Sequence, residues 1–203
     1  MRFLERLARC LFGLACFGTG ITLFLQSHLG LPPWDVFHKG VSEKTGISIG
    51  TVIIGTGVLL LLLWIPLRQR PGLGTVLNAL EIGLVVNLTK GFIGEPEALW
   101  ARSAMLVGGL LIVAFGSAMY IGAGLGPGPR DGLMMGLAER GVSVRMARTV
   151  IEIVVVVAGV LLGGTIGVGT VLFAVGIGPL VQVLLPRFDI RPVEPAVAAN
   201  ARP

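Results

Sequence analysis

The sequence predicts an all-α, polytopic membrane protein with six transmembrane helices. They form two inverted three-helix repeats, each with a short interfacial amphipathic helix. Three observations support this fold class. The 203-residue chain is 54% hydrophobic and 13% charged, about half the charge of an ordinary soluble domain. Its long uncharged runs reach the roughly 20 residues that a helix needs to cross a bilayer. Its second half repeats its first, as in many transporters.

The repeat is clearest in two twelve-residue segments. Residues 72–83 and 167–178 are offset by 95 positions and are identical at eight of the twelve. Upstream, residues 29–35 align with residues 125–131 at an offset of 96. The chain therefore divides into a first repeat (1–95), a second, inverted repeat (96–187) and a disordered cytoplasmic tail (188–203).

Apolar segments give the expected membrane helices, which in chain order are 7–28, 47–66, 73–90, 102–125, 146–163 and 169–186. The glycine-rich stretch from Gly163 to Gly169 divides the last apolar run into two spans, because glycine favours turns. Two further segments, 33–45 and 129–141, begin with proline and carry polar and apolar residues on different helical faces. We interpret them as amphipathic helices lying at the membrane interface, with a re-entrant dip as the alternative.

The basic residues set the orientation. With the N-terminus inside, twelve of the sixteen Lys and Arg residues fall on the cytoplasmic side. Both termini are then cytoplasmic, in the inner membrane of a bacterial cell. Each repeat has three spans, so the second copy inserts upside down, with Trp34 and Asp35 outside and Arg130 and Asp131 inside. The net charge of +5 lies in short loops, which excludes a nucleic-acid-binding face.

Two stripes of small residues predict close helix packing. They are Thr75, Ala79 and Gly83 in the first repeat, and Thr170, Ala174 and Gly178 in the second. We expect the third helix of each repeat to pack tightly, with contact between these two helices across a pseudo-axis as one arrangement. The preceding Gly-x-Gly-Thr motifs predict helix-capping turns rather than a phosphate cradle, because no lysine follows and no strand precedes them.

The carboxylates Asp35 and Asp131 occupy equivalent positions in the first turns of the two short helices. There a carboxylate can accept unpaired backbone N–H groups and offset the helix dipole. A functional alternative is that the two carboxylates mark gates or bind a substrate or ion.

Glu81 lies near the middle of the predicted helix 73–90, and Asn78 lies one turn earlier on the same face. An ionisable group at membrane depth is costly and is a candidate functional residue. The structural alternative is a neutral carboxyl that hydrogen-bonds to another helix, and both interpretations remain open. Glu152 stands four residues after Arg148, and an ion pair explains it.

No arrangement of residues indicates an enzyme, a metal site or a bound cofactor. The two histidines, His28 and His38, fall at the predicted outer face. The two cysteines, Cys10 and Cys16, lie six residues apart in one span, where neither a disulfide nor a metal site is expected.

Three segments resemble the YczE/YyaS/YitT-type bacterial integral membrane proteins. They are the Leu29-Gly30-x-x-Pro33-Trp34-Asp35 motif, the Gly46-Ile47-Ser48-x-Gly50 start of a span and the Gly72-x-Gly74-Thr75 turn. The similarity covers about residues 5–187. The second copy departs from the pattern, with Arg130 in place of the tryptophan and Arg145 in place of Gly50. The resemblance implies a multi-span inner-membrane protein and supplies no substrate.

The favoured functional hypothesis is a small transporter or permease with a site between the inverted repeats. The candidate residues are Glu81, Asn78, Asp35 and Asp131. The alternatives are an accessory membrane protein that docks a partner, or the membrane substrate-binding subunit of a modular importer. The expected partners are the lipid bilayer, an unknown small molecule or ion, and a second copy in a homodimer, because six helices make a small transporter.

Overall fold

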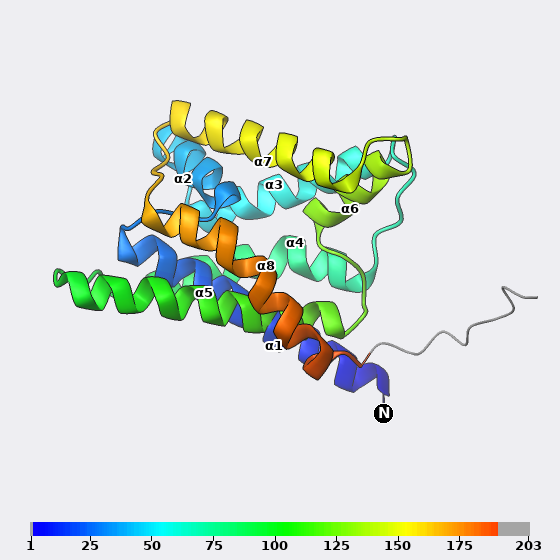
Figure 1. The fold of residues 1–203 in the computed structure, drawn as a ribbon, viewed down its shortest axis with the longest axis horizontal. Coiled ribbons are helices and arrows are strands. Elements are labelled where there is room, and N and C mark those ends of the chain that lie inside the picture. Colours follow the sequence, from blue (N-terminus) through cyan, green and yellow to red (C-terminus); the bar gives the residue numbers. More distant parts are fainter. Residues whose placement is uncertain (1, 191–203) are drawn as a thin grey trace, which may run out of the picture.

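The computed structural model describes residues 2–190, which form eight α-helices and no strand (Figure 1). The helices are α1 (Arg2–Ser27), α2 (Pro33–Thr45), α3 (Ile49–Trp64), α4 (Leu73–Lys90), α5 (Leu99–Gly122), α6 (Pro129–Ala138), α7 (Val144–Leu161) and α8 (Val168–Phe188). The all-α prediction is confirmed, and the bounds of α4 coincide with those predicted. The predicted break between the last two spans lies between α7 and α8.

Three helices of the described chain are long and apolar enough to cross a membrane. They are Phe3–Ser27, Leu99–Gly122 and Val168–Phe188. A fourth span results if α2 and α3, which meet at a bend of 116°, form one broken span. The predicted membrane location therefore has direct support, whereas the length and composition of these helices do not by themselves give six spans.

Helices α1 and α5 pack together through glycines at the centre of the molecule. A Cβ atom placed on Gly13 would lie 2.7 Å from the Gly116 carbonyl oxygen, and one on Gly20 would lie 2.9 Å from the Gly109 carbonyl oxygen. The earlier residue of α1 thus meets the later residue of α5, so the two helices run antiparallel. Gly13 and Gly20 are 96 positions before Gly109 and Gly116, so they are the equivalent residues of the two repeats. The first residue of one repeat therefore contacts the second of the other, and the reverse holds for the other contact.

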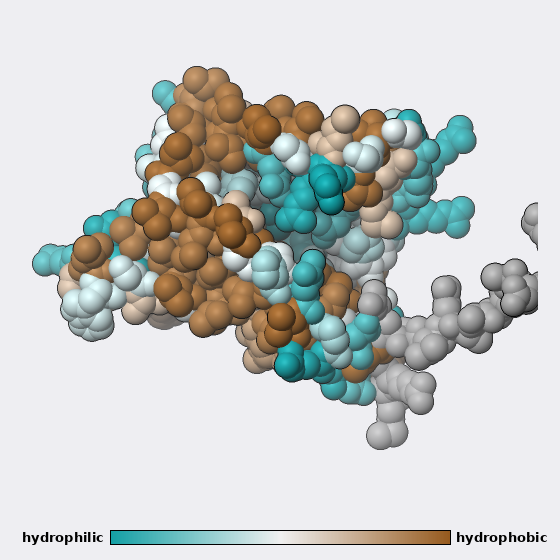
Figure 2. All heavy atoms as spheres, viewed as in Figure 1, coloured by the Kyte–Doolittle hydropathy of each residue, from teal (hydrophilic) through white to brown (hydrophobic). Residues whose placement is uncertain are grey.

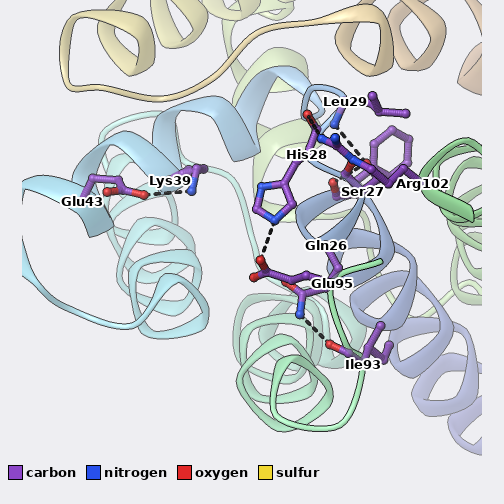
Figure 3. Close-up of polar contacts among 10 residues, drawn as sticks. Gln26, Ser27, His28, Leu29, Lys39, Glu43, Ile93, Glu95 and Arg102 are labelled. Carbon is purple, nitrogen blue, oxygen red and sulfur yellow. Dashed lines mark hydrogen bonds and ion pairs between the residues drawn. The ribbon is translucent and has the colours of Figure 1, made fainter. Parts of the chain in front are cut away.

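Two equivalent arginines hold the ends of these helices. Arg102 on α5 donates hydrogen bonds to the carbonyl oxygens of Ser27 (2.7 Å) and His28 (3.0 Å) at the C-terminal end of α1 (Figure 3). Arg6 on α1 donates in the same way to Ala123 and Gly124 at the end of α5. These bonds satisfy carbonyl groups that a helix C-terminus leaves unpaired.

The starts of α4 and α8 repeat the same relationship. The Gly74 N–H donates to the Leu125 carbonyl oxygen at 2.8 Å, and the Gly169 N–H donates to the Leu29 carbonyl oxygen at 2.8 Å. The two donors, Gly74 and Gly169, are equivalent in the two repeats, and so are the two acceptors, Leu125 and Leu29. Such matched contacts are those that a two-fold axis between the repeats would produce, and they support the predicted repeat.

The small-residue stripe of α4 packs against α3. Thr75 and Ala79 are buried, and a Cβ atom on Gly83 would lie 2.2 Å from the Gly50 carbonyl oxygen. The stripe of α8 differs from expectation. Ala174 is exposed, Thr170 is half-buried, and no atom lies within 4 Å of a Cβ atom placed on Gly178. Helices α4 and α8 share no extended contact in the described residues, so their predicted packing across the axis is wrong.

The two short helices begin in the protein interior, which favours the re-entrant alternative over the interfacial helices that we predicted. Trp34, Asp35 and His38 of α2 are buried, whereas the C-terminal end of α2 is exposed. There Lys39 donates to Glu43 at 2.8 Å and lowers the pKa of that carboxyl (Figure 3). At the start of α6, Pro129 and Gly132 are likewise buried, whereas Arg130 is half-buried and Asp131 is exposed. Both helices therefore run from the interior towards the surface, which agrees with the re-entrant alternative.

The predicted disordered tail starts too early. Helix α8 continues to Phe188, whose ring contacts Phe115 edge to face at 5.1 Å. The N–H of Ile190 donates to the Gly122 carbonyl oxygen. The remainder of the predicted tail, residues 191–203, lies outside the described residues.

Candidate functional site

A cavity of about 300 Å³ lies where α2 and α6 meet the longer helices. Figure 2 shows a hydrophilic hollow between the apolar surfaces of α7 and α8. The cavity is lined by both charged and apolar residues, including Phe17, Trp34, Ser117, Tyr120, Arg130, Asp131, Met134, Arg148, Glu152, Phe173, Ile177, Gly178 and Gln182. These residues come from both repeats, so the cavity lies between the two halves.

A difference between the repeats leaves room for this cavity. In the first repeat, α3 packs along α4, whereas in the second repeat α7 makes no comparable contact with α8. Helix α8 packs on α5, as α4 packs on α1, and crosses it obliquely (Figure 1). The open side of Gly178 consequently faces the cavity.

Arg130 lies between two aromatic rings at the start of α6. Its guanidinium carbon is 6.0 Å from the centroid of the Phe17 ring and 5.6 Å from that of Trp34. These distances suit cation–π attraction, which strengthens when the cation is removed from water. Within residues 2–190 the guanidinium takes part in no hydrogen bond or ion pair. Its N–H donors are therefore available to a ligand.

Asp131 lies next to Arg130 and also lines the cavity. The hydroxyl of Tyr120 donates to Asp131 Oδ2 at 3.5 Å, which is long for such a bond. Neither α2 nor α6 has a side-chain hydrogen bond that caps its N-terminus. The prediction that Asp35 and Asp131 accept the free N–H groups there is therefore wrong.

Arg148 and Glu152 of α7 form the predicted ion pair. The Arg148 Nε atom lies 3.0 Å from Glu152 Oε1, and both side chains are partly exposed. The pair lines the same cavity, together with Gln182 of α8. Arg148 and Glu152, which we explained from the sequence as an ordinary helical ion pair, thus contribute to the site.

A second, smaller cavity of about 40 Å³ lies on the other side of Trp34 and Arg130. Asp35, His38 and Asn78 line it. Asp35 Oδ1 lies 2.9 Å from His38 Nδ1, and His38 Nε2 is buried without a hydrogen-bond partner in the described chain. His38 is therefore buried rather than at the protein surface, where a polar helix end was inferred from the sequence.

Glu81 lies apart from both cavities, whose lining does not include it. Its side chain is half-buried, and its Oε2 atom is buried with no hydrogen-bond partner among residues 2–190. Asn78 lines the smaller cavity, so the structure does not bring Asn78 and Glu81 into one site. Of the four predicted candidates, Asp35, Asn78 and Asp131 lie around Trp34 and Arg130.

Comparison with known proteins places the chain. A family of unknown function, DUF6198, matches residues 4–186. The chain belongs to this family. It is 42% identical over 176 residues to an uncharacterised protein of Haemophilus influenzae, covering 86% of this chain and 81% of that protein. It is 32% identical to the uncharacterised membrane protein YczE of Bacillus subtilis (86% and 83% covered). It is 28% identical to the uncharacterised protein YyaS of the same organism (86% and 89%).

These relatives confirm the resemblance to YczE and YyaS that the sequence motifs indicated. The description of YczE as a membrane protein agrees with the apolar helices of this chain. No solved structure matches the chain. The site must consequently be interpreted from its own chemistry. Within the described residues, no group of three or more His, Cys, Asp or Glu side chains could hold a metal ion.

The residue that sequence analysis missed is Arg130. It was noted only as a departure from Trp34 in the repeat. A charged residue at an apolar repeat position was the available signal, because an arginine near membrane depth needs a partner or a ligand. Its proximity to the aromatic ring at the equivalent position could not be foreseen, because the two short helices were expected on opposite membrane surfaces.

Proposed function

We propose that the protein is a small transporter of the bacterial inner membrane, with a solute site in the cavity between its two repeats. One observation carries this proposal. The buried Trp34 and the half-buried Arg130, at equivalent repeat positions, meet at the wall of a cavity formed by both halves. Transporters with inverted repeats bind their solutes at the repeat interface, near the bilayer midplane.

The membrane arrangement we propose has six spans, with both termini in the cytoplasm. It is supported by the antiparallel contact of α1 and α5 and by the matched hydrogen bonds of the two repeats. The excess of Lys and Arg in the cytoplasmic segments gives the direction. Helices shorter than a full span suffice for α3, α4 and α7 where neighbouring helices and local thinning of the bilayer accommodate them.

In this arrangement α2 and α6 are half-helices that start near the bilayer midplane. Their Pro33 and Pro129 ends are directed at the region of Trp34 and Arg130. Non-helical backbone, such as the loops before these helices, is tolerated at membrane depth where it is buried in protein. Leu31 and Pro32 before α2 are buried, as is Gly128 directly before α6. Transport would follow from a relative movement of the halves around this point, driven by a gradient or another subunit.

Accessibility of a cavity residue from both membrane sides tests the proposal without knowledge of the solute. Ser117 is buried and lines the cavity. In a protein without Cys10 and Cys16, we expect Ser117→Cys to react with a membrane-impermeant maleimide in intact cells and in inverted vesicles. Val113→Cys, in the α1–α5 core, is the matched control and should react in neither. Reaction of Ser117→Cys from one side only would contradict transport and favour an accessory protein.

A further inference from the structure

We infer that the cavity binds a small zwitterionic solute of the amino-acid type with an apolar side chain. Its carboxylate lies at Arg130 and its ammonium group at Asp131. This inference rests on the proposed function, because it names the class of solute that the same site would carry.

The first argument is the unpaired cation. The Arg130 guanidinium lies in the cavity wall between Phe17 and Trp34, with no hydrogen bond or ion pair in the described chain. The guanidinium carbon lies over these two rings, and the rings offer its N–H groups no hydrogen-bond acceptor. A carboxylate matches such a group, because its two oxygens accept two parallel hydrogen bonds from the guanidinium fork.

The second argument is the pair of half-helices that meet at this point. Helix α2 has 13 residues and α6 has 10, and neither N-terminus is capped by a side chain. Each N-terminus carries the positive end of a helix dipole. Two such ends beside Arg130 favour the carboxylate of a solute at the same place.

The third argument is the carboxylate of Asp131 in the same cavity. Its contact with the Tyr120 hydroxyl is long, at 3.5 Å, and it forms no ion pair with Arg130. Asp35, in contrast, is hydrogen-bonded to His38 and lines only the smaller cavity. An ammonium group can donate up to three hydrogen bonds, so Asp131 and Tyr120 suit the amino group of a solute.

The overall charge of the cavity favours a zwitterion over a solute with a single charge. Its charged lining residues are Arg130, Arg148, Asp131 and Glu152, two of each sign. Because the two signs cancel, a net charge brought into this lining would remain uncompensated. A zwitterion adds none, and it pairs both free groups at once.

The remaining wall of the cavity is apolar and therefore favours a solute with an apolar side chain. Phe17, Met134, Phe173 and Ile177 contribute carbon surface from α1, α6 and α8. A volume of about 300 Å³ is at the small end of the range for ligand pockets. Leucine is a suitable probe, because its branched side chain would lie against these residues.

Calorimetric titration of the full-length protein in detergent tests the inference with three matched probes. They are L-leucine, 4-methylpentanoate, which lacks the amino group, and 3-methylbutylamine, which lacks the carboxylate. We expect L-leucine to bind at least about ten-fold more tightly than either analogue, because each analogue leaves one charge of the site unpaired. No binding of L-leucine to the folded wild type, or equal binding of an analogue, would overturn the inference.

Two variants assign the charges. Arg130→Gln should weaken L-leucine and 4-methylpentanoate binding by about ten-fold or more and leave 3-methylbutylamine unchanged. Asp131→Asn should weaken 3-methylbutylamine binding and leave 4-methylpentanoate binding unchanged. Arg145→Gln and Glu97→Gln, at exposed positions outside the cavity, are the matched controls. Equal loss of both analogues in each variant would contradict the assignment. If these binding tests fail while Ser117→Cys is still labelled from both membrane sides, the solute class is rejected and the transport proposal is retained.

Discussion

The guanidinium carbon of Arg130 lies 5.6 Å from the centre of the Trp34 ring, and the two residues hold equivalent positions in the two repeats. Each is the second residue of its short helix. The contact therefore joins the halves at the point where the pseudo-symmetry brings equivalent positions together. One tryptophan and one arginine can attract each other there, whereas two arginines would repel.

This contact should contribute to stability as a coupled pair. We expect Trp34→Leu and Arg130→Met each to lower the unfolding temperature in detergent, and the double variant to lower it by less than the sum. A cation–π contact removed from water corresponds to a coupling of about 1–2 kcal/mol. Trp100, which is 77% exposed, supplies the control, since Trp100→Leu and Arg130→Met should be additive. Additivity of the Trp34 pair would show that the contact contributes no stability.

Glycine substitutions should distinguish the two small-residue stripes. At Gly83 a leucine would collide with the Gly50 carbonyl oxygen, only 2.2 Å from a new Cβ atom, whereas Gly178 has open space. We expect Gly83→Leu to destabilise the protein by about 1–3 kcal/mol, the usual cost of overpacking, and Gly178→Leu to leave its thermal stability nearly unchanged. Size-exclusion chromatography after heating measures both, with Gly55→Leu as a control without near neighbours. Equal losses at Gly83 and Gly178 would mean that α8 packs more closely than described.

The paired arginines give a prediction about symmetry. Arg6 and Arg102 each donate two hydrogen bonds to helix-end carbonyls. Removal of either side chain leaves those carbonyls without their donor, which costs about 1–3 kcal/mol where they are buried. We expect Arg6→Ala and Arg102→Ala to lower the unfolding temperature by similar amounts. Arg9→Ala, which removes only an exposed pair with Glu5, should change it little. A large effect at one arginine alone would argue against equivalent roles.

Local signals in the sequence predicted the helices well. The Gly72 N–H donates to Thr75 Oγ1 at 3.1 Å, and the Gly167 N–H donates to Thr170 Oγ1 at 3.2 Å. These are the predicted capping turns, and each precedes a helix whose start was predicted to within one residue. Such turns depend on residues three apart, so the sequence contains all the information they need.

Features that depend on distant segments could not be predicted. The separation of α8 from α7 forms the cavity, yet the Gly178 stripe resembles the closely packed Gly83 stripe in sequence. The burial of His38 beside Asp35 depends on α2 turning inwards, which its amphipathic pattern does not reveal. The amphipathic pattern separates polar from apolar residues, and it does not reveal that Asp35 and His38 line a cavity while Glu43 and Lys44 meet water.

The direction of each repeat can be tested with single cysteines in a background without Cys10 and Cys16. Lys44 is exposed in the last turn of α2, and Arg145 is exposed in the first turn of α7, which follows α6. We expect Lys44→Cys to react with an impermeant maleimide in intact cells and Arg145→Cys to react only in inverted vesicles, because the repeats insert in opposite directions. Reaction of both from the same side would exclude the inverted arrangement.

The last prediction concerns Glu81, a carboxyl on α4 that lines neither cavity. A structural role as a hydrogen-bonded glutamate requires a partner, but its buried Oε2 has none in residues 2–190. Replacing a buried, unpaired polar group with an apolar one of similar size is neutral or stabilising. We therefore expect Glu81→Leu to unfold at the same temperature as the wild type or a higher one. Asn78→Leu is the matched control. It should have a lower unfolding temperature than Glu81→Leu, because Asn78 lies beside the polar groups of the smaller cavity.

Two Glu81 variants, Glu81→Gln and Glu81→Leu, distinguish a role in stability from a role in transport. If Glu81 served only the fold, both Glu81→Gln and Glu81→Leu would keep two-sided labelling of Ser117→Cys. If it carried a proton during transport, both would fold and bind solute but lose movement of the cavity between the two sides, because neither side chain can ionise. We expect the first result, since Glu81 lies away from Arg130 and Asp131. Loss of two-sided labelling in a folded Glu81→Gln protein would assign proton coupling to this helix instead.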